Sequence, residues 1–199
     1  NPDFKARVAP LIEITAKMGE RLGLSQNEMD DLSLLARFHD IGKITLSDRI
    51  LNKKQELAKD ELAEIKKHPE AGYRIAESSR ILSGISRHIL YHHEQWDGKG
   101  YLCGLKGKEI PLLSRILSVV DTYVELTSGK PLGKSMPLNE VIIKLREASG
   151  NKLDPEMVDV LISIIRDAKE DIEVFPIDRD FYLTCSCDFS KMTRATITR

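Results

Sequence analysis

Residues 32–43 read LSLLARFHDIGK, and the pattern in this stretch decides the fold. Leu32, Leu35 and His39 recur at helical spacing, so they share one face of a helix, and the two leucines mark that face as buried. His39 and the adjacent Asp40 therefore stand where apolar side chains are expected. Because a buried carboxylate is costly unless it is paired or binds a cation, this stretch predicts a helix that carries polar ligands into an α-helical core.

Three other segments repeat this arrangement of apolar residues that lead to an imidazole or a carboxylate. Ile85 and Ile89 lead to His92 and His93, Leu113 and Leu117 lead to Asp121, and Leu62 and Ile65 lead to His68. Neutral imidazoles and carboxylates that converge from several helices form a site suited to iron, manganese or a similar divalent metal. Six such ligands exceed the share of one ion, and adjacent residues on a helix diverge by about 100°, so His39 and Asp40 can bind different ions. The pattern predicts a two-metal centre.

Helical periodicity extends over most of the chain. Ser25 is a predicted helix cap, Gly42 and Pro69 are predicted boundaries, and a short segment is expected to start at Ser47 and Asp48. Helices are predicted over residues 11–22, 25–38, 59–67, 73–79, 81–91, 112–127, 138–148 and 155–168. Residues 96–110 are expected to form a long loop, and residues 173–199 lose the period, which hints at extended structure. The prediction is an all-α, multi-helix bundle with a short tail.

Length and composition limit the classes of protein to consider. The 199 residues suit one compact domain, expected over residues 1–170, with residues 171–199 as an appendage. The net charge of −1 argues against a DNA or RNA polymer as partner. No run approaches the roughly 18 apolar residues of a membrane span. Three cysteines, an odd number, and the lack of a signal peptide favour the cytoplasm, and a start without methionine suggests an excerpt of a longer protein.

The combined motifs resemble the HD-GYP family of cyclic di-GMP phosphodiesterases. They are the HDIGK run at residues 39–43, His68, the HHEQWDGKGY run at residues 92–101, and Asp121. The match covers about residues 22–155 and includes the spacing between the motifs, which makes it far more specific than any single motif. The fold implied by the resemblance, a helical bundle that holds two or three metals, agrees with the all-α prediction.

The resemblance also implies roles for individual residues. The six metal ligands would be His39, Asp40, His68, His92, His93 and Asp121. Asp40 would bridge two divalent ions, with iron the first expectation and manganese the second, and Lys43 would contact phosphate beside it as the other catalytic residue. Gly100, Tyr101, Lys130 and Lys134 would bind the substrate together with Lys43. Metal-activated water would hydrolyse a 3′–5′ phosphodiester of cyclic di-GMP to linear pGpG, GMP or both, in bacterial second-messenger signalling.

Four positions depart from the family pattern. Arg7 stands where the family has a further histidine, which favours two metals over three because arginine does not bind a metal. Leu102 replaces the proline of the Gly-Tyr-Pro motif, and the loop is expected to be looser without that ring. Val124 replaces an acidic residue. Lys130 replaces an arginine, so the charge is kept without the planar fork that binds phosphate in a bidentate way.

These departures leave alternatives open. The chain could be a catalytically weak or inactive module that binds cyclic di-GMP, an HD phosphohydrolase for another nucleotide, or a helical bundle without metal. His88, one turn before His92, is interpreted as a supporting or surface residue and not as a ligand. The resemblance further implies a regulatory domain upstream in the same chain, or a signalling protein as partner.

Overall fold

The structure is a computed structural model that describes residues 2–51, 53, 57–128 and 135–170, with side chains from residue 8 to residue 168 within these ranges. The regular elements in these ranges are all helical, apart from an isolated bridge between Ser149 and Leu153. They are α1 (Pro2–Leu22), α2 (Gln26–Phe38), the 3-10 helix η1 (Ile41–Thr45), α3 (Asp48–Leu51), α4 (Lys59–Ile65), α5 (His68–Glu77), η2 (Ser83–Ile85), α6 (Ser86–Tyr91), η3 (Gly107–Glu109), α7 (Leu112–Ser128), α8 (Leu138–Ala148) and α9 (Pro155–Glu170). The all-α prediction is confirmed, and the predicted extended tail lies outside the described residues.

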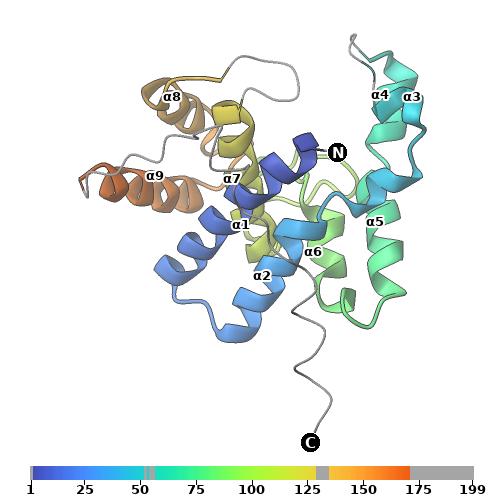
Figure 1. Ribbon diagram of the computed structural model, residues 1–199, viewed down its shortest axis with the longest axis horizontal. Helices are drawn as coiled ribbons and strands as arrows, with labels where there is room; N and C mark the ends of the chain where they lie inside the picture. The colour runs from blue at the N-terminus through green and yellow to red at the C-terminus, as the bar shows by residue number, and fades with distance from the viewer. Residues whose placement is uncertain (1, 52, 54–56, 129–134, 171–199) are drawn as a thin grey trace, which may run out of the picture. The chain divides into compact units, whose positions relative to one another are not determined.

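The helices of residues 1–166, which form one compact unit, pack as two groups that meet at α2 and α6. In the first group α1 and α2 pack against each other and against α7, and α8 also packs on α7 (Figure 1). In the second group α5 packs against η1 and α6. The HDIGK segment follows α2 directly, so it lies where the two groups join.

Most predicted boundaries agree with the structure, and the differences have local causes. Ser25 caps α2 in a capping box with Glu28, as its sequence position predicts. α1 begins at Pro2 and not at residue 11, because Pro10 is accommodated inside the helix. A proline removes one helical hydrogen bond and its ring crowds the carbonyl four residues earlier, but the surrounding turns continue when tertiary packing holds them.

The prediction that Leu62 points inward is wrong. Its side chain is 42% exposed, and α4 ends at Ile65 before His68 begins a new helix. Pro69 stands in the first turn of α5, where the missing N–H costs no helical hydrogen bond. His68 is therefore buried as the first residue of α5 and not as a continuation of α4.

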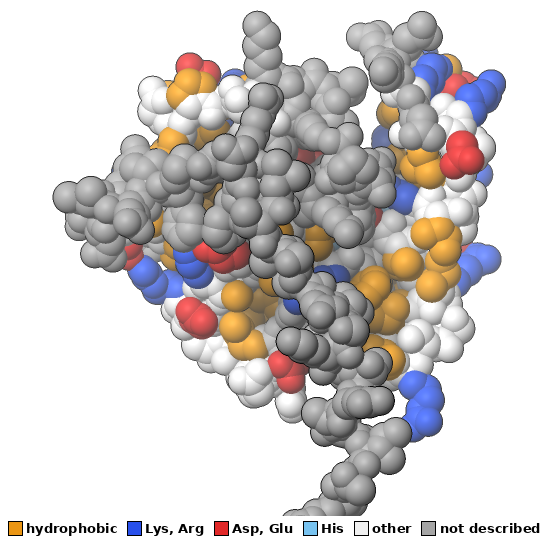
Figure 2. All heavy atoms as spheres, in the orientation of Figure 1, with side chains coloured by type: hydrophobic (Ala, Val, Ile, Leu, Met, Phe, Trp, Pro, Cys, Tyr) orange, Lys and Arg blue, Asp and Glu red, His pale blue; other side chains and the backbone are white. Residues whose placement is uncertain are grey.

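The face of the molecule in Figure 2 carries acidic and basic side chains interspersed with apolar ones over its described part. This mixture agrees with the formal net charge of −1.

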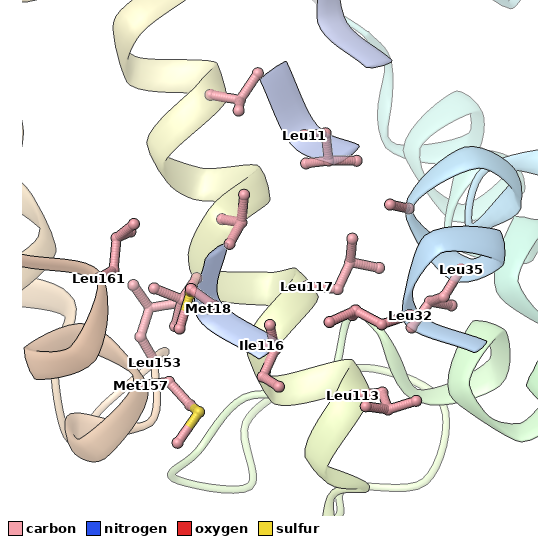
Figure 3. Packing of buried hydrophobic residues seen from close by; sticks show 14 of the residues in the cluster. Leu11, Met18, Leu32, Leu35, Leu113, Ile116, Leu117, Leu153, Met157 and Leu161 are labelled. Atoms are coloured by element: carbon pink, nitrogen blue, oxygen red, sulfur yellow. The ribbon is translucent and has the colours of Figure 1, made fainter. Parts of the chain in front are cut away.

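The core is formed by apolar side chains that α1, α2, α7 and α9 direct toward one another (Figure 3). The labelled members are Leu11 and Met18 from α1, Leu32 and Leu35 from α2, Leu113, Ile116 and Leu117 from α7, and Leu153, Met157 and Leu161 in and before α9. Leu11, Met18, Leu35, Ile116 and Leu117 are completely buried. This packing fixes α2, whose C-cap residue is His39, and α7, which carries Asp121 in its middle.

A buried ion pair that the sequence analysis missed ties α7 to the start of α9. Nη1 of Arg115 lies 2.6 Å from Oδ2 of Asp154, and Arg115 Nε donates to the carbonyl of Ile110 at 2.9 Å. The other carboxylate oxygen of Asp154 accepts the backbone N–H of Glu156 at 2.9 Å, so it caps α9. Both charges are satisfied by named partners, as a buried pair requires.

Candidate metal centre

Asp40 lies at the centre of the predicted ligands because of the turn that follows α2. His39 is the C-cap residue of α2, and Asp40 directly precedes the 3-10 helix η1. Oδ1 of Asp40 lies 3.3 Å from Nε2 of His68 and 4.0 Å from Nε2 of His92, and Oδ2 lies 3.5 Å from Nε2 of His39. The two carboxylate oxygens thus face different histidines.

Gly42 makes this approach between η1 and α5 feasible. A Cβ atom at this position would lie 1.9 Å from the carbonyl oxygen of His68 and 2.5 Å from the backbone nitrogen of Gly72. Both neighbours are backbone atoms and cannot rotate away. A residue with a side chain at position 42 would therefore separate Asp40 from His68.

Three histidines of the site are oriented by the same kind of local hydrogen bond. Nδ1 of His39 pairs with the carbonyl of Ala36 at 3.2 Å. The equivalent pairs, each three residues apart, are His68 with Ile65 at 2.7 Å and His92 with Ile89 at 2.6 Å. A carbonyl only accepts a hydrogen bond, so Nδ1 carries the proton and Nε2 is left to act as a ligand, as in metal sites whose second ring nitrogen is held by the protein.

Burial keeps the imidazoles of His92 and His93 neutral. It lowers the pKa of His92 well below its usual range, and the neighbouring His93 and His39 lower it further. The pKa of His93 falls to about 3, mainly through burial and then through His68, against the opposing charges of Asp40 and Asp121. Neutral imidazoles are the form that binds a metal.

Asp40 stays ionised in this environment. Burial alone would raise its pKa, but the neighbouring His39, the contact with His68 and the Lys43 ammonium together hold the pKa well below its usual range. Nζ of Lys43 lies 2.6 Å from Oδ2 of Asp40. The site therefore offers a carboxylate and neutral imidazoles as a nitrogen-and-oxygen donor set.

This donor set fits a divalent metal. One ligand atom from each of Asp40, His68, His92 and His93 lies within 4.8 Å of all the others. Nε2 of His39 is buried without a hydrogen-bond partner, which is costly unless something else binds it. Asp121 stands outside that group of four, although its charge acts on His93. The structure thus brings four predicted ligands together and places His39 against the opposite oxygen of Asp40.

Glu94 holds the glycine-containing loop over this cluster. Its Oε1 accepts the backbone N–H groups of Cys103 at 2.8 Å and Gly104 at 3.1 Å. A Cβ atom on Gly100 would lie 2.5 Å from the Cα atom of Glu94, so only glycine lets the loop backbone pack this closely. Glu94 has no predicted role, although its place directly after His92 and His93 in the sequence indicates a residue close to the site.

Tyr101 is presented to the cluster by this loop. Its ring stacks on His93, with 5.0 Å between the centroids and 29° between the planes. Burial raises the pKa of the Tyr101 hydroxyl, and the charges of Asp40, Asp121 and Glu125 raise it further. One stacking partner of the tyrosine is thus a residue of the site itself, and the hydroxyl remains protonated as a hydrogen-bond donor.

Leu102 changes the loop in a different way from the one expected. Its φ of 96° lies in the left-handed region that residues other than glycine rarely adopt. A proline cannot take this angle, because its ring fixes φ near −65°. The leucine marks a loop with another backbone path, held in place by the contacts of Glu94.

The remaining predicted residues lie apart from this cluster or outside the description. Lys130 and Lys134 lie outside the described residues, as does the side chain of Arg7. Val124 is buried in the core at 2% exposure, but the next residue, Glu125, stands one helical turn after Asp121 and its charge acts on Tyr101. An acidic side chain is therefore retained on this side of α7, and the i, i+4 spacing from Asp121 was the signal that could have identified it.

His88 contacts α7 and not the ligand cluster. Its carbonyl accepts a hydrogen bond from Oγ of Ser114 at 3.0 Å. Burial lowers the pKa of its ring. This arrangement agrees with the interpretation of His88 as a supporting residue.

Comparison with known proteins now identifies the architecture. The model of a family described as HD domain matches residues 1–157. The chain belongs to the HD domain family. It is 34% identical over 169 residues to a cyclic di-GMP phosphodiesterase of Thermotoga maritima, and 35% identical over 151 residues to the cyclic di-GMP phosphodiesterase response regulator RpfG of Xanthomonas campestris. The resemblance to the HD-GYP type is confirmed by these relatives.

The HD fold extends to solved structures. A crystal structure described as a cyclic GMP-AMP specific phosphodiesterase of V. cholerae superposes with a TM-score of 0.67 at 20% identity, over 82% of this chain and 44% of that one. The matches to the two sequence relatives cover 84% and 75% of this chain but 45% and 40% of theirs, so the HD domain corresponds to less than half of each relative. Among the described helices of this chain, none is long and apolar enough to cross a membrane.

Proposed function

We propose that this HD domain is a metal-dependent phosphodiesterase that cleaves the 3′–5′ phosphodiester of cyclic di-GMP to linear pGpG, GMP or both. One observation carries the proposal: an ionised Asp40 lies among histidines whose Nε2 atoms face it while each Nδ1 pairs with the backbone carbonyl three residues earlier. The substrate class follows from the relatives, which are named cyclic di-GMP phosphodiesterases. We further propose that the reaction takes place in the bacterial cytoplasm, as part of a second-messenger system.

The residues that would hold two divalent ions, with iron first and manganese second, are His39, Asp40, His68, His92, His93 and Asp121. Asp40 is the proposed bridge because its two oxygens face different histidines. Bound divalent ions supply an activated water and neutralise charge on the phosphoryl oxygens.

Other side chains would orient the substrate. Lys43, whose side chain is 36% exposed, can turn from Asp40 to a phosphoryl oxygen as a point charge. Tyr101 presents a protonated hydroxyl, and Gly100 allows the loop to lie close to the ligand segment. Lys130 and Lys134 remain proposed substrate contacts by resemblance.

The test pairs metal analysis with a hydrolysis assay on unmodified protein, His39→Ala and Asp40→Ala. The matched control is His88→Ala, which removes an imidazole outside the ligand cluster. Unmodified protein and the control should contain about two equivalents of iron or manganese and cleave cyclic di-GMP. Both ligand variants should lose metal, and hydrolysis should fall by at least a hundredfold.

The alternatives have distinct outcomes in the same experiment. Metal-loaded protein that binds cyclic di-GMP and leaves it intact over hours would be a binding module. Cleavage of another nucleotide in a panel that includes cyclic GMP-AMP, with cyclic di-GMP left intact, would assign a different substrate. Absence of bound transition metal after reconstitution would refute the metal centre itself.

A further inference from the structure

A lysine outside the predicted set lies at the edge of the site. Lys66 follows α4, and its Nζ lies over the ring of Tyr101, 5.5 Å from the ring centroid. The ring of Tyr101 in turn stacks on His93 at 5.0 Å. Since Lys66 is exposed to solvent, its ammonium can reach a ligand. Lys66 and the ligand residue His93 thus both contact the ring of Tyr101.

The charged groups around Tyr101 determine what the Lys66 ammonium contributes to the site. The carboxylates of Asp40, Asp121 and Glu125 all act on the tyrosine, so its surroundings are negative. Lys43 is already engaged by Asp40 at 2.6 Å. An anionic group that approaches Tyr101 from the α4 side would meet the ammonium of Lys66.

We propose that Lys66 binds the second phosphodiester of a cyclic dinucleotide, the one that is not cleaved. This inference rests on the proposed function. A cyclic dinucleotide carries its two phosphodiesters on opposite sides of one ring, so one cannot lie at the Asp40 cluster without the other lying beyond it. Lys66 contacts Tyr101 at the edge of the cluster, and an ammonium with three rotatable donors suits a phosphodiester oxygen.

The consequence is a preference for substrates with two phosphates. Lys66 would contribute to binding and not to bond cleavage, because it contacts Tyr101 and is not one of the proposed metal ligands. A competing role is purely structural: the ammonium could hold the tyrosine in place through its ring. The two roles predict different effects of a Lys66 substitution on KM for a substrate with a single phosphodiester. A structural role would raise that KM, and a role in binding the second phosphodiester would leave it unchanged.

The variants are Lys66→Met, which keeps an apolar stem without the charge, Lys66→Arg, which restores a charge, and Lys67→Met as the matched control. Lys67 is the next residue and is also exposed. KM and kcat are measured for cyclic di-GMP and for bis(p-nitrophenyl) phosphate, which has one phosphodiester. The Kd of cyclic di-GMP is measured separately by calorimetric titration of chelator-treated protein, in which no hydrolysis occurs.

Lys66→Met should raise the Kd and KM of cyclic di-GMP about five- to tenfold and leave kcat within about twofold. It should not alter KM for bis(p-nitrophenyl) phosphate, Lys66→Arg should recover most of the loss, and Lys67→Met should behave as unmodified protein. Equal values for Lys66→Met and Lys67→Met, an equal rise for both substrates, or no binding of cyclic di-GMP would overturn the inference. Weaker binding by Lys66→Met in a protein without hydrolysis would support it and refute only the proposed activity.

Discussion

Replacement of Gly42 by alanine should dismantle the centre without removing a ligand. The new Cβ atom would lie 1.9 Å from the carbonyl oxygen of His68, whereas ordinary contact begins at 3.4 Å. η1 must then retreat from α5 by about 1.5 Å, since neither backbone can rotate away. The 3.3 Å separation of Asp40 Oδ1 and His68 Nε2 would open by a similar amount. Metal–ligand distances tolerate only about 0.2 Å, so both residues could not serve one ion.

The measurements are metal content after reconstitution and thermal unfolding with and without metal. Gly42→Ala should bind less than about one equivalent in place of two, and lose about 1–3 kcal/mol of unfolding free energy, the usual cost of overpacking. Metal should raise the Tm of unmodified protein and leave that of Gly42→Ala nearly unchanged. Far-UV circular dichroism establishes that the variant remains helical.

Two other glycines provide a graded control. A Cβ atom at Gly84 would come no closer than 3.4 Å to Asp31, so Gly84→Ala should bind metal normally. A Cβ atom at Gly72 would lie 2.8 Å from the movable Cγ2 of Ile89, so an intermediate effect is expected. Gly42→Ala protein with full metal content and an unfolding free energy within about 0.5 kcal/mol of unmodified protein would refute the reasoning.

Three further outcomes test other parts of the structure. Glu94→Ala removes the acceptor of two loop N–H groups, so urea denaturation should show a loss of about 1–3 kcal/mol with metal content retained; an unchanged midpoint contradicts this. Asp154→Ala leaves the Arg115 guanidinium buried and unpaired and should cost about 3–5 kcal/mol in the same assay, and a loss under about 1 kcal/mol argues against the pair. In chelator-treated protein, His93 has a pKa of about 3 when folded and about 6.5 when unfolded, so the unfolded chain binds more protons between these values and stability falls as pH falls through that window. Thermal unfolding at pH 7.5 and pH 5.5 should show a lower Tm at pH 5.5 and a smaller difference for His93→Phe; a Tm that rises on acidification contradicts the burial of a neutral ring.

The sequence predicted the fold well where one helix buries one face. Leu32 and Leu35 are buried as their spacing requires, and His39 is 4% exposed at the end of the same face. His68 was identified through the wrong helix, because the periodicity of residues 59–67 was extended across a boundary at which a new helix starts. Its burial is real, but it comes from α5 packing against η1, which is a tertiary contact.

Features that depend on contacts between distant segments could not be predicted. Lys66 meets Tyr101 because the end of α4 lies beside a loop 35 positions further along the chain, and no periodicity encodes this. The positive φ of Leu102 is equally hidden, since leucine has no preference for that region and neighbouring contacts impose it. Glu125 could have been found, because its spacing from Asp121 places both on one side of α7.

The pairing of each Nδ1 with a carbonyl three residues earlier has an implication for how such a site can change. The orientation of each imidazole is set by a carbonyl three residues earlier in the sequence, that of Ala36, Ile65 or Ile89, and for His68 this contact spans the boundary between α4 and α5. Each of these histidines thus forms one local unit with the carbonyl that orients it, and the connections between the units can vary in length without changing the orientation of an imidazole. Insertions between residues 45 and 59, or between residues 77 and 83, would alter the surroundings of the centre without changing the orientation of the ligands. Domains with very different loops around the site can therefore keep the same set of ligands.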